Sequence, residues 1–171
     1  MQLIALRSAV LSLVLCTACS SPGASGADPL APAPAGRHHE GMTDRRIIRT
    51  DAAPAAIGPY SQAVVHGGLV YCSGQIALDP RTQELVQGGV EVQARRALQN
   101  LEGVLAASGS SLKEALRLTV YLKDIADFPK VNAVYAEFFP ADAPPARATV
   151  GVGALPKGAL VEIDCIAAAG R

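Results

Sequence analysis

Two charged side chains near the C-terminus could do chemistry, Arg147 and Glu162. The planar guanidinium of an arginine can hold a carboxylate through two parallel hydrogen bonds, and a positioned carboxylate can activate water. Arg147 leads into a strand-like run, where an arginine ordinarily forms a surface salt bridge. Glu162 alternates with Val161 and Ile163, so it lies on the opposite face of the strand-like run from these apolar residues. A glutamate on such a face is ordinarily solvated. Residue type alone therefore leaves both the chemical and the surface interpretation open.

Metal or disulfide chemistry has weaker support. Cys16 and Cys19 lie in the N-terminal leader, and no second ligand pair at zinc spacing accompanies them. Cys72 and Cys165 each lie in a strand-like run, so they could pair in an oxidising compartment or serve as two small buried hydrophobes. The sequence His38-His39-Glu40 has no further ligands nearby and is interpreted as solvated linker. We expect no metal and no cofactor.

The first 19 residues are typical of a signal peptide. Arg7 supplies the positive charge, and the apolar run at 9–15 is shorter than the ~20 residues that span a bilayer. The segment 16–21 resembles a bacterial lipobox with Cys19 as the lipid-bearing residue, although Cys16 stands where Leu is usual. Ordinary cleavage to a soluble product is the alternative. We expect an exported protein, either periplasmic or an outer-membrane lipoprotein, whose only membrane contact is a lipid anchor.

A flexible tether and one domain follow the leader. Residues 20–45 are rich in Ala, Pro, Gly and Ser and lack apolar periodicity, so they predict a flexible tether. Residues 46–171 predict the domain. It holds 12 of the 15 basic and 12 of the 15 acidic residues. A domain without basic excess is a poor match for a phosphate backbone, so nucleic acid is not expected as a partner.

The hydrophobic periodicity of the domain predicts the order β-β-β-α-β-α-β-β, an α+β fold with two helices on one face of a mixed sheet. Glycines at His66-Gly67-Gly68 indicate a tight hairpin. Residues 69–72 are apolar on both faces, which suggests that the face without helices is covered by self-association. The predicted strands and helices, in chain order, are 46–50, 62–65, 69–73, the helix around 94–105, 116–123, the helix from 127, 146–152 and 160–167.

Several segments of the domain resemble proteins of the reactive intermediate deaminase family, also called Rid or YjgF. The matching segments, in the family's order, are AAPAAIGPYSQ at 52–62, SGQI at 73–76, DP at 79–80, PKVNAVY at 129–135, PARATV at 145–150 and LPKGALVEI at 155–163. The resemblance implies a chorismate-mutase-like fold and a homotrimer with active sites between subunits. It implies hydrolysis of enamines and imines, such as 2-aminoacrylate or 2-iminobutanoate, to 2-keto acids and ammonia.

The resemblance also assigns roles to residues. It implies that Arg147 clamps the substrate carboxylate and that Glu162 orients and activates the attacking water. The remaining site residues are Tyr60 and Ser73, which would line the site, the backbone of Gly74 and Thr149, which would hold the substrate, and Asn132. Thr149 replaces the Cys or Ser that is common in the family, which removes any thiol role. The alternatives are a family member without deaminase activity, either RNA-cleaving or chaperone-like, and an exported module that binds a small molecule without turnover.

Overall fold

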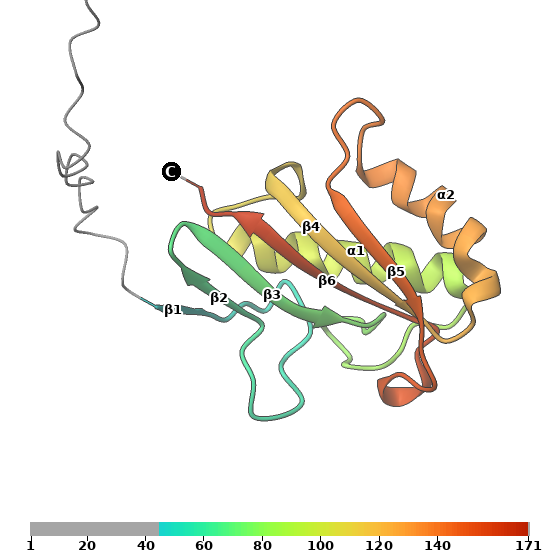
Figure 1. The fold of residues 1–171 in the computed structure, drawn as a ribbon. Helices are drawn as coiled ribbons and strands as arrows, with labels where there is room; N and C mark the ends of the chain where they lie inside the picture. Colours follow the sequence, from blue (N-terminus) through green and yellow to red (C-terminus); the bar gives the residue numbers. More distant parts are fainter. Residues whose placement is uncertain (1–44, 171) are drawn as a thin grey trace, which may run out of the picture. The chain divides into compact units, whose positions relative to one another are not determined.

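The computed structural model describes residues 45–170, which form a six-stranded sheet with two α-helices on one face (Figure 1). The strand order is β1-β2-β3-β6-β4-β5; β4 and β5 are parallel and the other neighbours are antiparallel. The predicted α+β class and element order are confirmed. The elements are β1 (Arg46–Ile48), β2 (Ala63–His66), β3 (Leu69–Gln75), α1 (Val90–Ala107), β4 (Ala115–Leu122), α2 (Phe128–Phe138), β5 (Ala146–Gly151) and β6 (Val161–Ala168), with short 3-10 turns η1 (Leu112–Glu114), η2 (Ile125–Asp127) and η3 (Pro156–Gly158).

The predictions for the N-terminal region concern residues outside this range. They are the signal peptide, the lipid site at Cys19, the tether and the sequence His38-His39-Glu40. Within residues 45–170, no helix has the length and apolar character needed to cross a bilayer.

The hairpin between β2 and β3 closes where the glycines predict it. His66 pairs with Leu69, and the two residues between them, Gly67 and Gly68, have φ of 59° and 78°. Positive φ at both central residues is the type I′ geometry, whose twist matches that of the flanking strands. The turn fixes the register that brings Ser73 and Gly74 to the far end of β3.

Helix α1 supplies most of the core on one side of the sheet. Its apolar stripe packs against β3 and β6, and a salt bridge between Arg95 and Glu137, 2.6 Å long, joins its outer surface to α2. Gly109 follows the end of the helix with φ of 80°, as expected for a residue that reverses the chain. The stripe residues are fully buried: Ala94, Ala97, Leu98, Leu101, Val104 and Leu105.

Strand β6 lies between β3 and β4, and its residues alternate between buried and half-buried along the strand. Val161, Ile163 and Cys165 are buried toward the helices, whereas Glu162 points to the helix-free face. Cys165 is paired in register with Cys72 on β3; both thiols are free and buried, and burial raises the pKa of each to about 12. The structure therefore supports the interpretation of the two cysteines as small buried hydrophobes.

Candidate active site

A pocket of about 540 Å³ opens at one end of β3 and β6, and four of the predicted site residues line it. They come from three separate parts of the chain: Tyr60 from the loop before β2, Ser73 and Gly74 from β3, and Glu162 from β6. The rest of the wall is mainly apolar and comes from the same loop, the segment after β3 and η3: Pro54, Ala55, Ile57, Gln62, Gln75, Ile76, Leu78, Pro156 and Lys157.

The carboxylate of Glu162 lies directly against Gly74. A Cβ atom at Gly74 would be 2.0 Å from Oε1 of Glu162, so the carboxylate could keep this position only beside a glycine, whose φ is not unusual here. Within residues 45–170, no group donates a hydrogen bond to the side-chain carboxylate of Glu162. Partial burial raises the pKa of the Glu162 carboxyl, and the charge of Asp164 raises it further. A raised pKa makes the carboxylate a stronger base toward a water molecule.

The loop that carries Tyr60 is fixed at its base by Gln62. The Gln62 side chain accepts a hydrogen bond from the backbone N–H of Thr50 (2.8 Å) and donates to the carbonyl oxygen of Pro54 (2.7 Å). Ser73 donates its hydroxyl to the carbonyl oxygen of Ser61 (2.6 Å), so Ser73 also holds this loop in addition to lining the pocket. Tyr60 itself is half exposed and forms part of the pocket rim.

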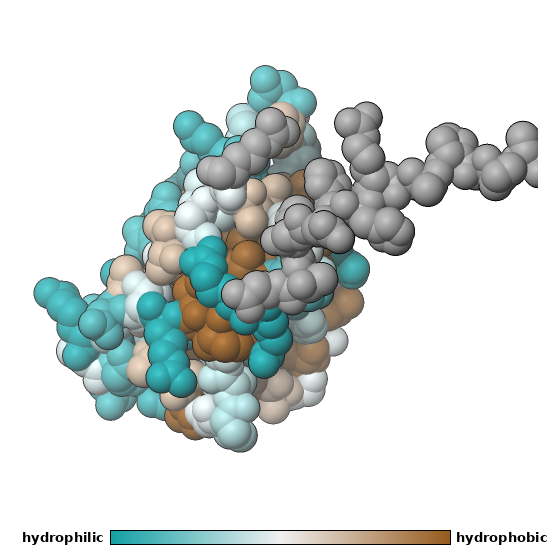
Figure 2. Space-filling view, turned by 90° about the vertical axis from the view of Figure 1, so that its left-hand side faces the viewer, coloured by the Kyte–Doolittle hydropathy of each residue, from teal (hydrophilic) through white to brown (hydrophobic). Residues whose placement is uncertain are grey.

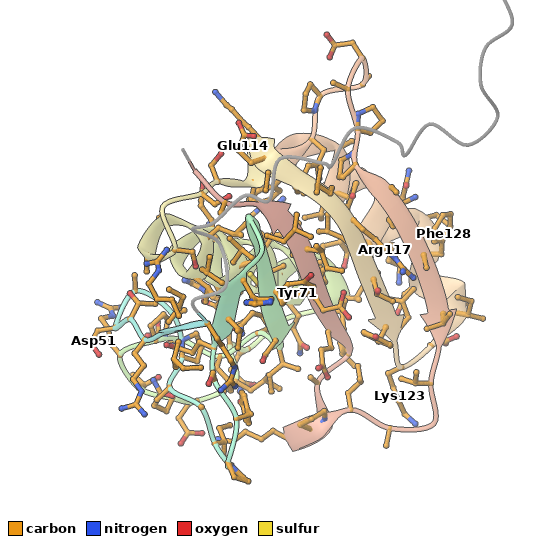
Figure 3. The ribbon with its side chains drawn as sticks, turned by 60° about the vertical axis from the view of Figure 1, so that its left-hand side comes forward. Asp51, Tyr71, Glu114, Arg117, Lys123 and Phe128 are labelled. Atoms are coloured by element: carbon orange, nitrogen blue, oxygen red, sulfur yellow. The ribbon has the colours of Figure 1, made fainter. Side chains whose placement is uncertain are left out.

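Arg147 lies on the other face of the sheet, at the edge formed by β5. Its register partner on β4 is Leu118, which is fully buried toward the helices. Its guanidinium carbon is 4.5 Å from the ring centre of Tyr135 and 5.5 Å from that of Phe128, and Nη2 donates to Oδ1 of Asn132 (2.9 Å). Figure 3 shows Phe128 beside the β5 edge. The guanidinium thus rests on α2 in one defined orientation.

The charge of Arg147 is not paired within the described part of the chain. The three salt bridges there join Arg81 to Asp79, Arg95 to Glu137, and Lys130 to Asp127. The surface ion pair that an arginine at this position ordinarily forms is therefore absent from residues 45–170. Arg147 instead lines a groove of about 390 Å³ between α2 and the start of β5, together with Asn132.

The predicted site residues therefore form two groups that one chain does not bring together. Glu162, Tyr60, Ser73 and Gly74 share the pocket at the β3–β6 end, whereas Arg147 and Asn132 share the groove at α2. Thr149 lines neither of these spaces, although its side chain is on the same face of β5 as Arg147, because it pairs in register with Val120, which is buried toward the helices. We call the first group the Glu162 half-site and the second group the Arg147 half-site.

Sequence reasoning missed two features of these half-sites. Phe128 and Tyr135 were not among the predicted site residues, yet with Asn132 they form the surface on which the guanidinium rests. Their spacing of four and three residues places all three on one helix face, which is the signal that could have revealed it. Asp164 was also missed, although it lies two residues from Glu162 on the same strand face. No three His, Cys, Asp or Glu side chains in residues 45–170 are placed to share a metal ion.

Comparison with known proteins gives consistent matches over this region. Residues 50–169 match the family model described as Endoribonuclease L-PSP. Protein DfrA of Myxococcus xanthus is 55% identical over 125 residues, which cover 72% of this chain and 95% of that protein. The human 2-iminobutanoate/2-iminopropanoate deaminase is 47% identical over 126 residues, covering 74% of this chain and 91% of that protein.

Solved structures agree with these matches. RidA from the Antarctic bacterium Psychrobacter sp. PAMC 21119 is 44% identical with a TM-score of 0.69, covering 72% of this chain and 98% of that one. TdcF of E. coli, solved with bound serine, is 41% identical with a TM-score of 0.68 and the same coverage. The chain therefore belongs to the Rid (YjgF) family, whose family model carries the name Endoribonuclease L-PSP.

Proposed function

We propose that this chain hydrolyses reactive imines and enamines of the 2-iminobutanoate or 2-aminoacrylate type to 2-keto acids and ammonia. The observation that carries the proposal is the carboxylate of Glu162, half-buried in a pocket and placed against a glycine. Arg147, a cation with no carboxylate partner among residues 45–170, supports it, because a 2-imino acid presents one carboxylate for such a group to bind. Relatives from human and goat that are named as 2-iminobutanoate/2-iminopropanoate deaminases, 47% and 50% identical, add further support.

In the proposed reaction, Arg147 binds the substrate carboxylate. Asn132 occupies one N–H group of the guanidinium, which leaves other donors for a bidentate pair with the substrate. The rings of Tyr135 and Phe128 hold the guanidinium in place, so little orientational freedom is lost when the carboxylate binds. This interaction fixes the imine carbon relative to the water that attacks it.

Glu162 then acts on that water. It accepts a proton from the water as the oxygen forms a bond to the carbon of the protonated imine, which gives a carbinolamine. The proton passes from Glu162 to the nitrogen, the carbon–nitrogen bond breaks with its electron pair on nitrogen, and ammonia leaves. The carboxylate of Glu162, free again, accepts the remaining proton from the oxygen and passes it to solvent, and the 2-keto acid forms. An enamine first takes up a proton on carbon and then follows the same route.

We further propose that the complete site forms between copies of the chain in a homotrimer, with the Arg147 half-site of one copy facing the Glu162 half-site of the next. The two half-sites lie on opposite faces of one sheet, which supports a site shared between chains. The helix-free face supports it too, because Tyr71 and Val150 expose 43% and 42% of their surface there. Figure 2 shows hydrophobic surface exposed among hydrophilic side chains on that side of the molecule.

RNA cleavage is not proposed, despite the name of the family model. Residues 46–171 carry 12 basic and 12 acidic side chains, and affinity for a phosphate backbone depends on basic excess. A module that binds imino acids without turnover, or a chaperone-like protein, remains the alternative to be separated by experiment.

The test is incubation of the purified protein with imines generated in place from several amino acids, with release of the 2-keto acid followed over time. We expect release to accelerate above the spontaneous rate, and we expect Arg147→Ala to abolish most of the acceleration. A binding module would slow or leave unchanged the spontaneous hydrolysis. A chaperone-like protein would keep its surface effect after Arg147→Ala.

We also propose export with lipidation at Cys19, on the basis of the leader sequence. A multiply acylated cysteine anchors a protein firmly in a membrane, whereas a single chain anchors it weakly. Cys19→Ala should then move the protein from the membrane fraction to the soluble fraction. An unchanged distribution between the two fractions would refute the anchor.

A further inference from the structure

A second carboxylate accompanies Glu162 on β6. Residues two apart on a strand share a face, so Asp164 lies beside Glu162 on the helix-free side of the sheet. Both oxygens of Asp164 have donors from β4: Oδ1 accepts from the backbone N–H of Thr119 (3.1 Å), and Oδ2 accepts from the hydroxyl of Tyr121 (3.0 Å). Asp164 is therefore held in place on the strand face, while the side-chain carboxylate of the neighbouring Glu162 accepts no hydrogen bond from residues 45–170.

Tyr121 lies next to both Glu162 and Asp164. Its backbone is paired in register with Glu162, while its hydroxyl reaches Asp164. Neither Tyr121 nor Asp164 lines the pocket in which Glu162 lies. Within one chain, Asp164 therefore lies next to the pocket residue Glu162 without lining the pocket itself.

We propose that Asp164 is a positioning residue whose negative charge favours a proton on Glu162 during the reaction. This inference rests on the proposed deamination. Glu162 takes a proton from the attacking water and must hold it until the proton moves to the departing nitrogen. An anion fixed beside Glu162 stabilises the protonated carboxyl during that interval, because two adjacent like charges repel. The hydrogen bond from Tyr121 keeps the side chain of Asp164 in that place.

The other groups facing Glu162 do not supply this negative charge. Arg117 is paired in register with Ile166, beyond Asp164, and Figure 3 shows it on β4. The ammonium group of Lys157 donates to the carbonyl oxygen of Gln83. Lys123, just after β4, lies beside Leu160 on the same face, but it is a cation and its ammonium group donates to the carbonyl oxygen of Gly153. The titratable and charged groups around Glu162 are therefore Tyr121, Lys123 and Arg117 on or next to β4, Tyr71 on β3, Asp164 on β6, and Tyr60 and Lys157 at the pocket rim. In the proposed assembly, Arg147 of a neighbouring copy joins them.

The experiment is a pH titration followed by NMR of protein labelled with ¹³C at the glutamate carboxyl carbons. The Glu162 signal is identified by its loss in Glu162→Gln. In Asp164→Asn, which keeps the shape and an acceptor for Thr119, we expect the titration midpoint of Glu162 to fall by on the order of half a pH unit or more. Glu102→Gln removes a carboxylate from the exposed side of α1, and it should leave the midpoint unchanged.

The pH profile of deamination provides the second measurement. The acidic limb of kcat/KM reports the free enzyme, so it should move to lower pH by the same amount in Asp164→Asn. A purely structural role would lower the rate without moving the limb. If Asp164→Asn does not fold, Asp164→Ser replaces it, because a hydroxyl can still accept from Thr119.

The outcomes separate this inference from the proposed function. An unchanged or higher midpoint in the neutral variant overturns the role of Asp164, whether or not the protein deaminates imines. A lowered midpoint in a protein without deaminase activity leaves the coupling of Asp164 and Glu162 in place and refutes the proposed function instead.

Discussion

The two half-sites of this chain differ in how each holds its charge. Glu162 is an anion placed in a pocket of mainly apolar wall, against a glycine and without a hydrogen-bond donor among residues 45–170. Arg147 is a cation at the sheet edge, held by one amide oxygen and two aromatic rings, with no carboxylate partner among the same residues. The Glu162 environment raises proton affinity, whereas the Arg147 environment fixes orientation.

The Glu162 half-site has a base but no guanidinium that could bind a carboxylate, and the Arg147 half-site has that guanidinium but no base. A substrate with a carboxylate next to a protonated imine needs an oriented cation and a base within a few ångströms of each other. One chain carries the two groups on opposite faces of its sheet, so in the proposed trimer it would supply them to two different neighbours. The variants below remove either group separately, or alter the geometry that holds it.

The largest loss is expected for Glu162→Gln. The amide keeps the size and burial of the side chain but cannot accept the proton, and general acid–base catalysis typically contributes roughly 10²–10⁴-fold. We expect kcat to fall within that range while KM changes little, as measured by keto-acid release across substrate concentrations. A larger rise in KM than fall in kcat would mean that Glu162 binds substrate instead of activating water.

The second-largest loss of activity is expected for Arg147→Ala. Removal of one partner from a desolvated charge pair typically costs about 2–5 kcal/mol. At about 1.36 kcal/mol per tenfold change, this corresponds to roughly 30-fold to several-thousand-fold in kcat/KM. Arg147→Lys should recover little, because an ammonium group cannot form the bidentate pair. Parent-like deamination by Arg147→Ala, with folding intact, would remove Arg147 from the site.

Gly74→Ala tests the geometry of the Glu162 half-site. The new methyl group would lie 2.0 Å from Oε1 of Glu162, so the carboxylate must move while the backbone stays in place. Displacement of a catalytic group by about 1 Å can cost on the order of 10²-fold in rate. We expect a fall in kcat of about 10- to 100-fold with little change in Tm. Gly153→Ala is the matched control, because nothing lies within 4 Å of a Cβ there.

The smallest effect concerns stability as a function of pH. The pKa of Glu162 is raised in the folded protein above its ordinary value of 4.5, so the folded state binds more protons than the unfolded state in the interval between the two values. Stability contributed by this group therefore falls as pH rises through that interval. Glu162→Gln should gain Tm relative to the parent above about pH 4.5, by on the order of a few °C or less. Equal Tm differences at low and neutral pH would argue against the raised pKa.

The sequence predicts most of the fold because its local signals agree. The hairpin glycines, the apolar stripe of α1 and the alternation in β6 each match one element of the structure. These signals depend on neighbours within a few residues, which a single sequence contains. The resemblance to the family then supplies the order of the site segments.

The sequence does not predict how the site is divided. Arg147 and Glu162 lie on the last two predicted strands of the chain, and the family resemblance implies sites between subunits, but the local pattern does not place these strands in the sheet. In the structure β5 is at the sheet edge, β4 lies between β5 and β6, and the two side chains take opposite faces. Strand order and register depend on long-range pairing, and local periodicity does not specify them. The place of Phe128 and Tyr135 against Arg147 depends on the same long-range packing.

The most direct test of the shared site is complementation between two inactive variants. Arg147→Ala and Glu162→Gln are unfolded together at equal concentrations, refolded, and assayed for keto-acid release. In a trimer with sites between neighbours, each site takes its Arg147 half-site from one copy and its Glu162 half-site from the next. With random mixing, both half-sites are intact in about a quarter of all sites, so about a quarter of the parent activity should return. Each variant refolded alone should remain inactive. Absence of recovery in a mixed trimer of confirmed composition would contradict the shared site and place the chemistry within one chain.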